Sequence, residues 1–312
     1  MINRLFYFLF TFCIFSMSSL ANEIKVSKKK FKIIKQTGQS KSYATNGNEI
    51  TDSSLKDDGY YKKGLPVKYT KGSNILIDNT TGLIWEDTKN VSSLKKPWNE
   101  ADSYCKDLIL NSNNDWRLPT PEELENVIDY TGHLSKSNKT YFKNHGYYYV
   151  SSTKKIINKN KKAYAFHAYY AITYGETTML EINYPMSVRC VRGTEKKDKI
   201  NIELEWENSS KKPRKNMKKW EESIEYCETL SENGYTDWRL PNINELRSLL
   251  DRNNTKPAIV DGFKNTGLKW VYWSSTTGNI TGCPIGVDFT FGTIVSTIGK
   301  DSKAFVRCVR DK

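Results

Sequence analysis

The chain has 312 residues, and its 48 Lys and Arg outnumber its 35 Asp and Glu, which gives a formal net charge of +13. Hydrophobic residues make up 38% and aromatic residues 12% of the chain, enough to build packed cores, so a wholly disordered protein is excluded. At roughly 100 to 200 residues per domain the length predicts two domains, and after the N-terminus no stretch reaches the ~18 apolar residues that a membrane-spanning helix needs.

The first 21 residues have the pattern of a cleaved export signal. A positive start at Arg4 precedes an apolar run from Leu5 to Met17, and small residues follow at the positions that a signal peptidase reads. An uncleaved membrane anchor is the alternative. Residues 22–56 are polar and rich in Lys, and we expect a flexible linker there. The mature protein is therefore expected in the periplasm, on the cell surface or outside the cell.

From residue 57 onward the sequence contains two copies of one unit, which we place at residues 57–193 and 194–312. Self-similarity in a constant order identifies a repeated folding unit. In the repeated Asp-Trp-Arg motif we expect the Trp to fill the core and the Arg to pair with a buried carboxylate or carbonyl, and ligand binding is the alternative role. These residues are Asp115, Trp116 and Arg117 in the first unit and Asp237, Trp238 and Arg239 in the second.

Each unit is predicted to contain two helices followed by strands. The first helix begins near Trp98 in the first unit and near Trp220 in the second, where apolar residues recur at helical spacing. The second helix begins at a capping box led by Thr120 or Asn242, and in the first unit its apolar face extends through Ile128. Tyr, Val, Thr, Phe and Ile with Gly turns then predict an antiparallel sheet. This order of elements is typical of the α+β class.

Five of the six Cys lie outside the expected signal, and exported proteins tend to form disulfides. Each unit has one Cys on its first helix and one on its last strand, so the repeat predicts the pairs Cys105–Cys190 and Cys227–Cys308. Each pair would stabilise the fold by roughly 4 to 5 kcal/mol in the chain-entropy model. Cys283 is left as a free thiol, an intermolecular bridge or an alternative partner within the second unit. No Cys-x-x-Cys occurs and the three His are isolated, so we expect no metal site and no cofactor.

Four motifs recur in the same order in both units: a first helix with its Cys, Asp-Trp-Arg-Leu-Pro, a Ser-Ser-Thr strand and a terminal Val-Arg-Cys-Val-Arg. In this set, which covers residues 57–310, the chain resembles the C-terminal domain of the Lcl-type bacterial collagen-like adhesins. The resemblance implies tandem C-type-lectin-like domains, each with a disulfide from first helix to last strand, that bind sulfated glycosaminoglycan or matrix. No collagen repeat precedes them, so a trimeric stalk is not implied. The tripeptides of calcium-dependent sugar binding are also missing.

The basic residues concentrate in two stretches that contain no acidic residue. One lies between residues 151 and 173, and the other comes just before the first helix of the second unit. We expect these stretches to bind a polyanion with a strong dependence on salt, and the alternative is solvated loops that keep the surface soluble. The candidate ligand-binding residues are Lys154, Lys155, Lys159, Lys161, Lys162, Lys211, Lys212, Arg214, Lys215, Lys218 and Lys219.

Three functional hypotheses follow. The first is an exported, non-enzymatic adhesion or binding protein for anionic, sulfated polysaccharide or extracellular matrix, with added avidity if one polymer reaches both basic stretches. The second is an envelope protein that binds another protein, with the charge incidental. The third, an enzyme, is disfavoured because no Gly-x-Ser-x-Gly, His-Glu-x-x-His or phosphate-loop motif occurs. Nucleic acid is not an expected partner of an exported protein.

Overall fold

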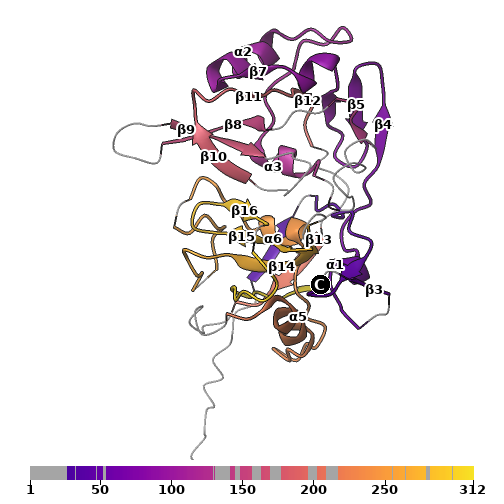
Figure 1. Ribbon diagram of the computed structural model, residues 1–312, viewed down its shortest axis with the longest axis vertical. Helices are drawn as coiled ribbons and strands as arrows, with labels where there is room; N and C mark the ends of the chain where they lie inside the picture. Colours follow the sequence, from indigo (N-terminus) through magenta and orange to yellow (C-terminus); the bar gives the residue numbers. More distant parts are fainter. Residues whose placement is uncertain are drawn as a thin grey trace, which may run out of the picture.

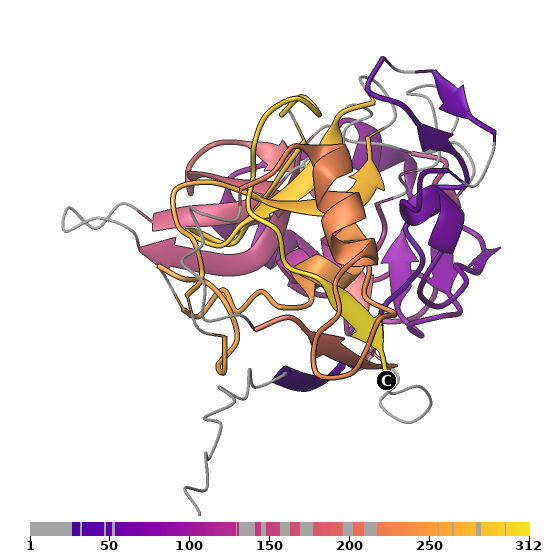
Figure 2. The same ribbon diagram turned by 90° about the horizontal axis from the view of Figure 1, so that it is seen from below.

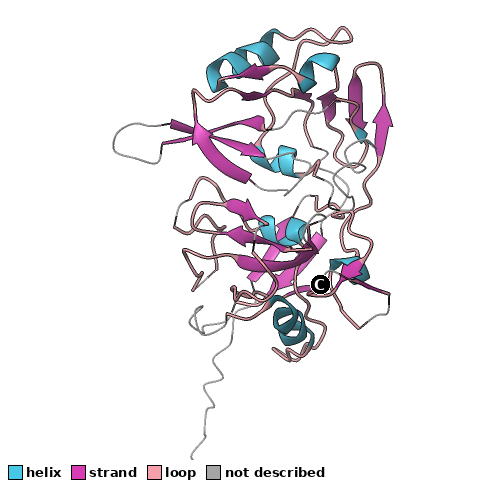
Figure 3. Cartoon of the chain, in the orientation of Figure 1, coloured by secondary structure: helices cyan, strands magenta, loops and turns pink. Residues whose placement is uncertain are grey.

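Short strands make up most of the regular structure of the protein, as the computed structural model in Figure 3 shows. The structure describes residues 27–31, 33–46, 48–51, 54–128, 130, 141–144, 148–156, 163–168, 177–195, 202–208, 217–254, 256–263, 265–278, 282–296 and 298–312. The expected signal peptide, residues 1–21, lies outside them. Few helices and several antiparallel sheets confirm the α+β class. No helix within the described ranges is long and apolar enough to cross a membrane.

The first unit occupies the upper half of Figure 1. Its elements are β4 (Tyr69–Lys71), β5 (Ile75–Asp78), β6 (Ile84–Glu86), the 3-10 helix η1 (Lys89–Ser92), β7 (Lys95–Lys96), α2 (Trp98–Asp107), α3 (Pro121–Glu125), β8 (Tyr149–Ile156), β9 (Ala163–Ala168), β10 (Thr177–Glu181), β11 (Met186–Ser187) and β12 (Val191–Arg192). One sheet has the order β12-β6-β5-β4, and the other has the order β10-β9-β8-β11-β7. Neighbouring strands run antiparallel except β11 and β8, which are parallel.

The second unit lies below the first in the same view (Figure 1). Its elements are β13 (Ile202–Trp206), α5 (Trp220–Glu228), α6 (Ile243–Arg247), β14 (Tyr272–Thr277), β15 (Pro284–Asp288), β16 (Thr293–Val295) and β17 (Val309–Asp311). Strands β14, β15 and β16 form an antiparallel sheet. The first helices of the two units, α2 and α5, lie at opposite ends of the long axis of the molecule.

Residues 27–63, which we call the N-terminal segment, pack on the second unit although the first unit follows them in the chain. The segment contains β1 (Ser27–Phe31), β2 (Ser42–Tyr43), β3 (Glu49–Ile50) and α1 (Asp58–Tyr61). Strand β1 pairs antiparallel with β13, whose other side pairs with β17 (Figure 2). The first unit has the same arrangement around β6, which pairs with β5 on one side and with β12 on the other. In the first unit β5 therefore corresponds to β1.

The described part of residues 22–56 therefore differs from the flexible linker that the composition indicates. The free edge of β13 provides backbone hydrogen-bond partners for β1, which the composition of β1 does not reveal. Ile34 is 3% exposed and packs in one hydrophobic core with Leu204 and Trp206 of β13. The segment is thus part of the second unit in space and adjoins the first unit in sequence.

Both predicted capping boxes are present, with Thr120 at the start of α3 and Asn242 at the start of α6. The helices are shorter than the apolar pattern indicates, since α3 ends at Glu125 and not at Ile128. After α3 the N–H groups of Val127 and Ile128 donate to the carbonyl three residues earlier, as in a 3-10 turn. For example, the Ile128 N–H donates to the Glu125 carbonyl at 3.2 Å. The apolar residues that follow each helix still pack inward, and Val127 is 4% exposed.

The two disulfides predicted from the repeat are also present. Each joins the first helix of a unit to the residue just before its last strand, and all four sulfur-bearing side chains are buried. Trp116 and Trp238 pack in the same cores, as expected. Cys283 is half-buried and forms no disulfide within the chain. The bonded pairs are Cys105–Cys190 and Cys227–Cys308.

Lys35 ties the N-terminal segment to both units. Its ammonium donates to Asp78 Oδ2 at 2.8 Å and to the Asn126 carbonyl at 2.9 Å in the first unit. Its own carbonyl accepts from Asn244 Nδ2 at 2.8 Å in the second unit. The side chains of Lys35 and Asp78 are each 1% exposed, and this burial lowers the pKa of Lys35 against the opposing charge of Asp78. Loss of either partner would leave an unpaired buried charge, which is strongly destabilising.

Asp58 is a buried carboxylate that holds α1 against β14. Its Oδ2 accepts from Thr37 Oγ1 at 2.5 Å and from Thr276 Oγ1 at 2.7 Å. Burial raises the pKa of Asp58 to about 7, although the two hydroxyl bonds act in the opposite direction. The carboxylates of Glu245 and Asp57 nearby raise this pKa further. Asp58 therefore gives the contact between the N-terminal segment and the second unit a dependence on pH.

We predict that Asp58 makes the protein less stable as the pH rises from about 4 to about 7. In this range the folded chain keeps a proton on Asp58 that the unfolded chain has released, so the free energy of unfolding falls with pH. The substitution Asp58→Asn keeps an acceptor oxygen and carries no charge. The free energy of unfolding of this variant should therefore fall by about 3 kcal/mol less between about pH 5 and about pH 8 than that of the unchanged protein. Urea unfolding at both pH values measures this, and an equal fall in the two proteins would contradict it.

Candidate functional site

The Arg of each repeated motif forms a bidentate ion pair with the Glu of the neighbouring capping box. Arg117 bonds Glu123 at 2.7 and 2.6 Å, and Arg239 bonds Glu245 at 2.7 and 2.8 Å. Each Glu also accepts the backbone N–H at the start of its helix, so the pair fixes the motif loop to that helix. Each repeated Arg thus pairs with the carboxylate of a Glu in the following helix. In the last strands, Arg192 forms a bidentate pair with Asp115, and Arg310 bonds both Asp237 and Glu205.

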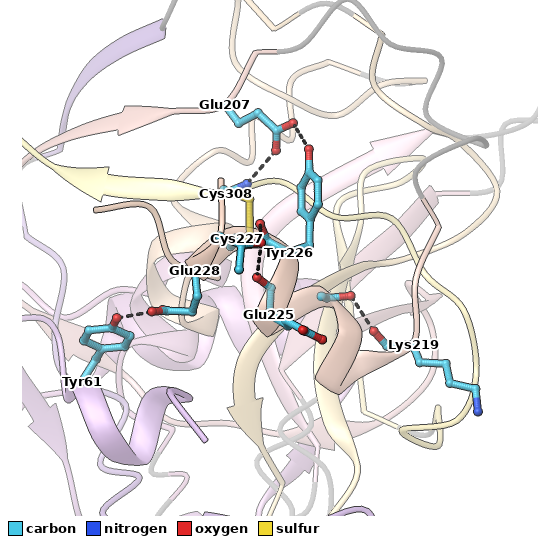
Figure 4. The surroundings of a disulfide bond; sticks show 10 residues. Tyr61, Glu207, Lys219, Glu225, Tyr226, Cys227, Glu228 and Cys308 are labelled. Atoms are coloured by element: carbon cyan, nitrogen blue, oxygen red, sulfur yellow. Dashed lines mark hydrogen bonds between the residues drawn. A yellow bond between two sulfur atoms is a disulfide. The ribbon is translucent and has the colours of Figure 1, made fainter. Parts of the chain in front are cut away.

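A second buried arrangement connects each disulfide to the strand that opens the unit. In the second unit, Glu207 accepts from the Tyr226 hydroxyl at 2.9 Å and from the Cys308 N–H at 3.2 Å (Figure 4). Glu86 makes the corresponding bonds in the first unit. These groups bond to one another in both units, and we therefore look for a ligand site elsewhere.

The N-terminal segment covers the outer side of α5 and the adjoining ends of β14 and α6. Glu221 on α5 accepts from the Thr45 hydroxyl at 2.5 Å. Glu228 lies seven residues later on the same side of the helix. It accepts from the Tyr61 hydroxyl at 2.7 Å (Figure 4) and from the Lys56 ammonium at 2.9 Å. We call this surface the covered face and define it by the residues that bond to the segment, which are Glu221, Glu228, Asn242, Thr276 and Thr277.

A lysine lies over an aromatic ring beside the covered face. The ammonium of Lys300 is 4.3 Å from the centroid of the Trp220 ring. It donates to the backbone carbonyls of Tyr43 and Ala44 in the N-terminal segment, the second at 2.9 Å. Burial lowers the pKa of Lys300 to about 8, against the raising effect of Glu221. The segment thus supplies oxygen atoms to a cation that the second unit buries.

The corresponding surface of the first unit is exposed, and we call it the open face. The contrast is clearest at the repeated Arg, because the Arg117 side chain is 38% exposed whereas that of Arg239 is 4% exposed. On the Ser-Ser-Thr strands, Lys154 is exposed whereas the matching Thr277 is buried. By the sequence repeat, the open face consists of Asn99, Lys106, Thr120, Thr153 and Lys154.

Lys154, a candidate site residue from the sequence, also lies over an aromatic ring. Its ammonium is 3.4 Å from the centroid of the Trp98 ring and 3.4 Å from Asn99 Oδ1. The ring is held in place because Trp98 Nε1 donates to the Ser151 carbonyl at 2.9 Å. A cation–π contact therefore positions an exposed charge at the edge of the open face. The second unit has the same combination in Lys300 and Trp220, and there the N-terminal segment bonds to the lysine.

Of the other candidate basic residues, Lys218 and Lys219 are the ones whose side chains the structure describes, and they lie elsewhere. Lys218 lies over the Tyr226 ring at 5.0 Å, and Lys219 pairs with Asp301 at 3.1 Å, both at the start of α5. Lys155 belongs to β8, but its side chain lies outside the described residues, and so do several other candidates. These are Lys159, Lys161, Lys162, Lys211, Lys212, Arg214 and Lys215. Lys154 contacts Trp98 at the start of α2, whereas Lys218 and Lys219 directly precede α5, and these two helices lie at opposite ends of the molecule (Figure 1).

A groove of about 570 Å³ runs along α2 next to the open face. Its charge is mixed, because Lys96, Glu100 and Asp107 all line it. Its apolar part includes Ile109, whose side chain is 75% exposed. A full list of the lining residues is Lys96, Asn99, Glu100, Ser103, Tyr104, Asp107, Leu108 and Ile109.

Sequence reasoning missed the covered face and the role of Lys300. Lys300 stands alone in a Gly-Lys-Asp-Ser turn, a context typical of a solvated loop, and no local signal places it over Trp220. The repeat does align the two helices, so a comparison of Asn99 with Glu221 and of Lys106 with Glu228 would have shown that the two outer faces differ in charge.

Comparison with known proteins adds the following findings. A family model described as the Lcl C-terminal domain matches the chain twice, over residues 74–192 and 198–310. No curated protein and no solved structure gives a significant match. Within the described residues, no group of three or more His, Cys, Asp or Glu side chains is arranged to hold a metal ion.

Proposed function

Because the chain belongs to the Lcl C-terminal domain family in both of its units, we propose that it is an exported, non-enzymatic protein that binds anionic, sulfated polysaccharide or extracellular matrix. The family match suggests an adhesin-like protein, and disulfides are typical of proteins outside the cytoplasm. We also propose a C-type-lectin-like scaffold for each unit. Nucleic acid is not proposed as a partner.

The observation that carries this proposal is the exposed ammonium of Lys154 over the Trp98 ring. The ring holds the charge at the surface without neutralising it, so an anionic group is free to bind on its other side. Lys154 belongs to a stretch of the sequence that has five Lys and no acid, and the whole chain carries +13. Sulfate groups along a polymer would be attracted to this charge and would release counterions on binding.

We predict that full-length mature protein binds immobilised heparin and that Lys154→Gln weakens this binding. Loss of one charge contact should reduce the slope of log affinity against log salt by about one, and changing all five Lys of the stretch to Gln should reduce it by up to about five. Elution in a salt gradient measures both. The control is Lys303→Gln, an exposed lysine of the second unit. Identical elution of the Lys154 and Lys303 variants would count against the proposal.

A protein partner is the second candidate, and the groove along α2 favours it. Ile109 is exposed there next to carboxylates and a lysine, a mixture that suits a polypeptide better than a sulfated polymer. Apolar contacts would make such binding insensitive to salt.

The substitution Ile109→Asp separates the two candidates. If a protein binds in the groove, capture of that protein should be lost in the variant because a charge replaces the apolar contact, while heparin elution stays unchanged. Pull-down from extracellular and envelope fractions at two salt concentrations, followed by heparin elution, makes the comparison. A variant that captures the same proteins as the unchanged chain would exclude the groove as their site.

A further inference from the structure

The covered face shows which positions of this repeated unit contact an extended chain. Residues of the N-terminal segment contact one side of α5, at Glu221 and Glu228. They also contact β14, at Thr276 and Thr277. Gln39, for example, accepts the Thr277 N–H at 2.8 Å. The second unit therefore carries an occupied binding surface whose occupant is known.

The same positions in the first unit differ in charge. Glu221 and Glu228 of α5 correspond to Asn99 and Lys106 of α2, and Thr277 corresponds to Lys154. Three matched positions thus carry two carboxylates on the covered face and two ammonium groups on the open face. The occupant of the covered face matches its acidic character, because Lys56 pairs with Glu228.

We propose that the open face of the first unit binds an anionic polysaccharide chain along Lys154, Asn99 and Lys106, in the place that the N-terminal segment takes on the second unit. This inference rests on the proposed function and adds the location of the site and the number of sites. The positive charge of Lys56 fits the carboxylates of α5 and would be repelled by Lys106, so a second copy of the N-terminal segment does not suit the open face. A ligand with carboxylate or sulfate groups does suit it.

The chemistry of the contacts points in the same direction. On the second unit, two carbonyl oxygens bind the ammonium of Lys300 over Trp220. On the first unit, the ammonium of Lys154 over Trp98 is exposed, and its described hydrogen bond, to Asn99, is 3.4 Å long. Lys106 pairs with Asp102 at the surface, a type of contact that competes weakly with a charged ligand. Oxygen atoms of a sulfated polymer would contact Lys154 as the two carbonyls contact Lys300.

The second unit supplies the design of the test, because α5 already carries Glu at the two helix positions. The double substitution Asn99→Glu with Lys106→Glu gives α2 the residues of α5, so the helix should still fold. It should lower the affinity for a size-defined heparin oligosaccharide by roughly tenfold or more, because two carboxylates replace an amide and an ammonium. Fluorescence anisotropy with the full mature chain measures the affinity. The matched control is Asn253→Glu with Lys303→Glu, the same changes at exposed positions of the second unit.

The possible results are distinguishable. Loss of binding in the double variant and not in the control supports the open face. Equal binding in all three proteins overturns the open face and leaves the proposed function intact. If the unchanged chain does not bind heparin, the proposed function fails, and a polyglutamate probe then decides the face. Polyglutamate binding that the double variant loses would make the ligand an acidic polypeptide and overturn the polysaccharide, and absence of binding to either probe would overturn both proposals.

Discussion

The pairing of β1 with β13 is the contact on which the arrangement of the whole chain depends. Five residues of the N-terminal segment form a ladder with the strand that opens the second unit, and β17 completes the same sheet from the other side. An exposed strand edge favours pairing with any available strand. β1 pairs with this edge of β13, so the residues that follow β1 cross the second unit before the chain enters the first unit. One ladder thereby places α1, the β2–β3 hairpin and Lys35.

The two units share their internal construction. In each, an Arg and a capping-box Glu fix the motif loop, a disulfide joins the first helix to the last strand, and a Glu accepts from a Tyr hydroxyl and a Cys N–H. Across the junction, Arg252 of the second unit pairs with Glu122 and the buried Glu125 of the first. Repetition of these contacts explains why one set of motifs serves both units, since each motif residue satisfies another motif residue.

The surfaces of the two units nevertheless differ, and the difference originates outside the repeat. The N-terminal segment contacts the acidic outer side of α5 and buries the polar end of β14, whereas the corresponding surface of the first unit keeps Lys154 and the repeated Arg exposed. A duplicated unit therefore gives one surface used to bind the chain itself and another that is available to a ligand. The charge of each helix face agrees with this division.

The sequence alone determined the repeat, the α+β class, the two capping boxes and the disulfide pairs. These features depend on residues of one type at fixed spacing within a unit, where local preference and packing agree. The helix ends were placed too late, because apolar residues such as Val127 stay buried in the tighter turns that follow α3. Only the tertiary structure decided that residues 27–63 belong with the second unit, that Lys300 lies over Trp220 and that the face around Lys154 is open. Each of these depends on contacts between residues far apart in the chain, and a polar, Lys-rich segment carries no local sign of the strand edge that will take it.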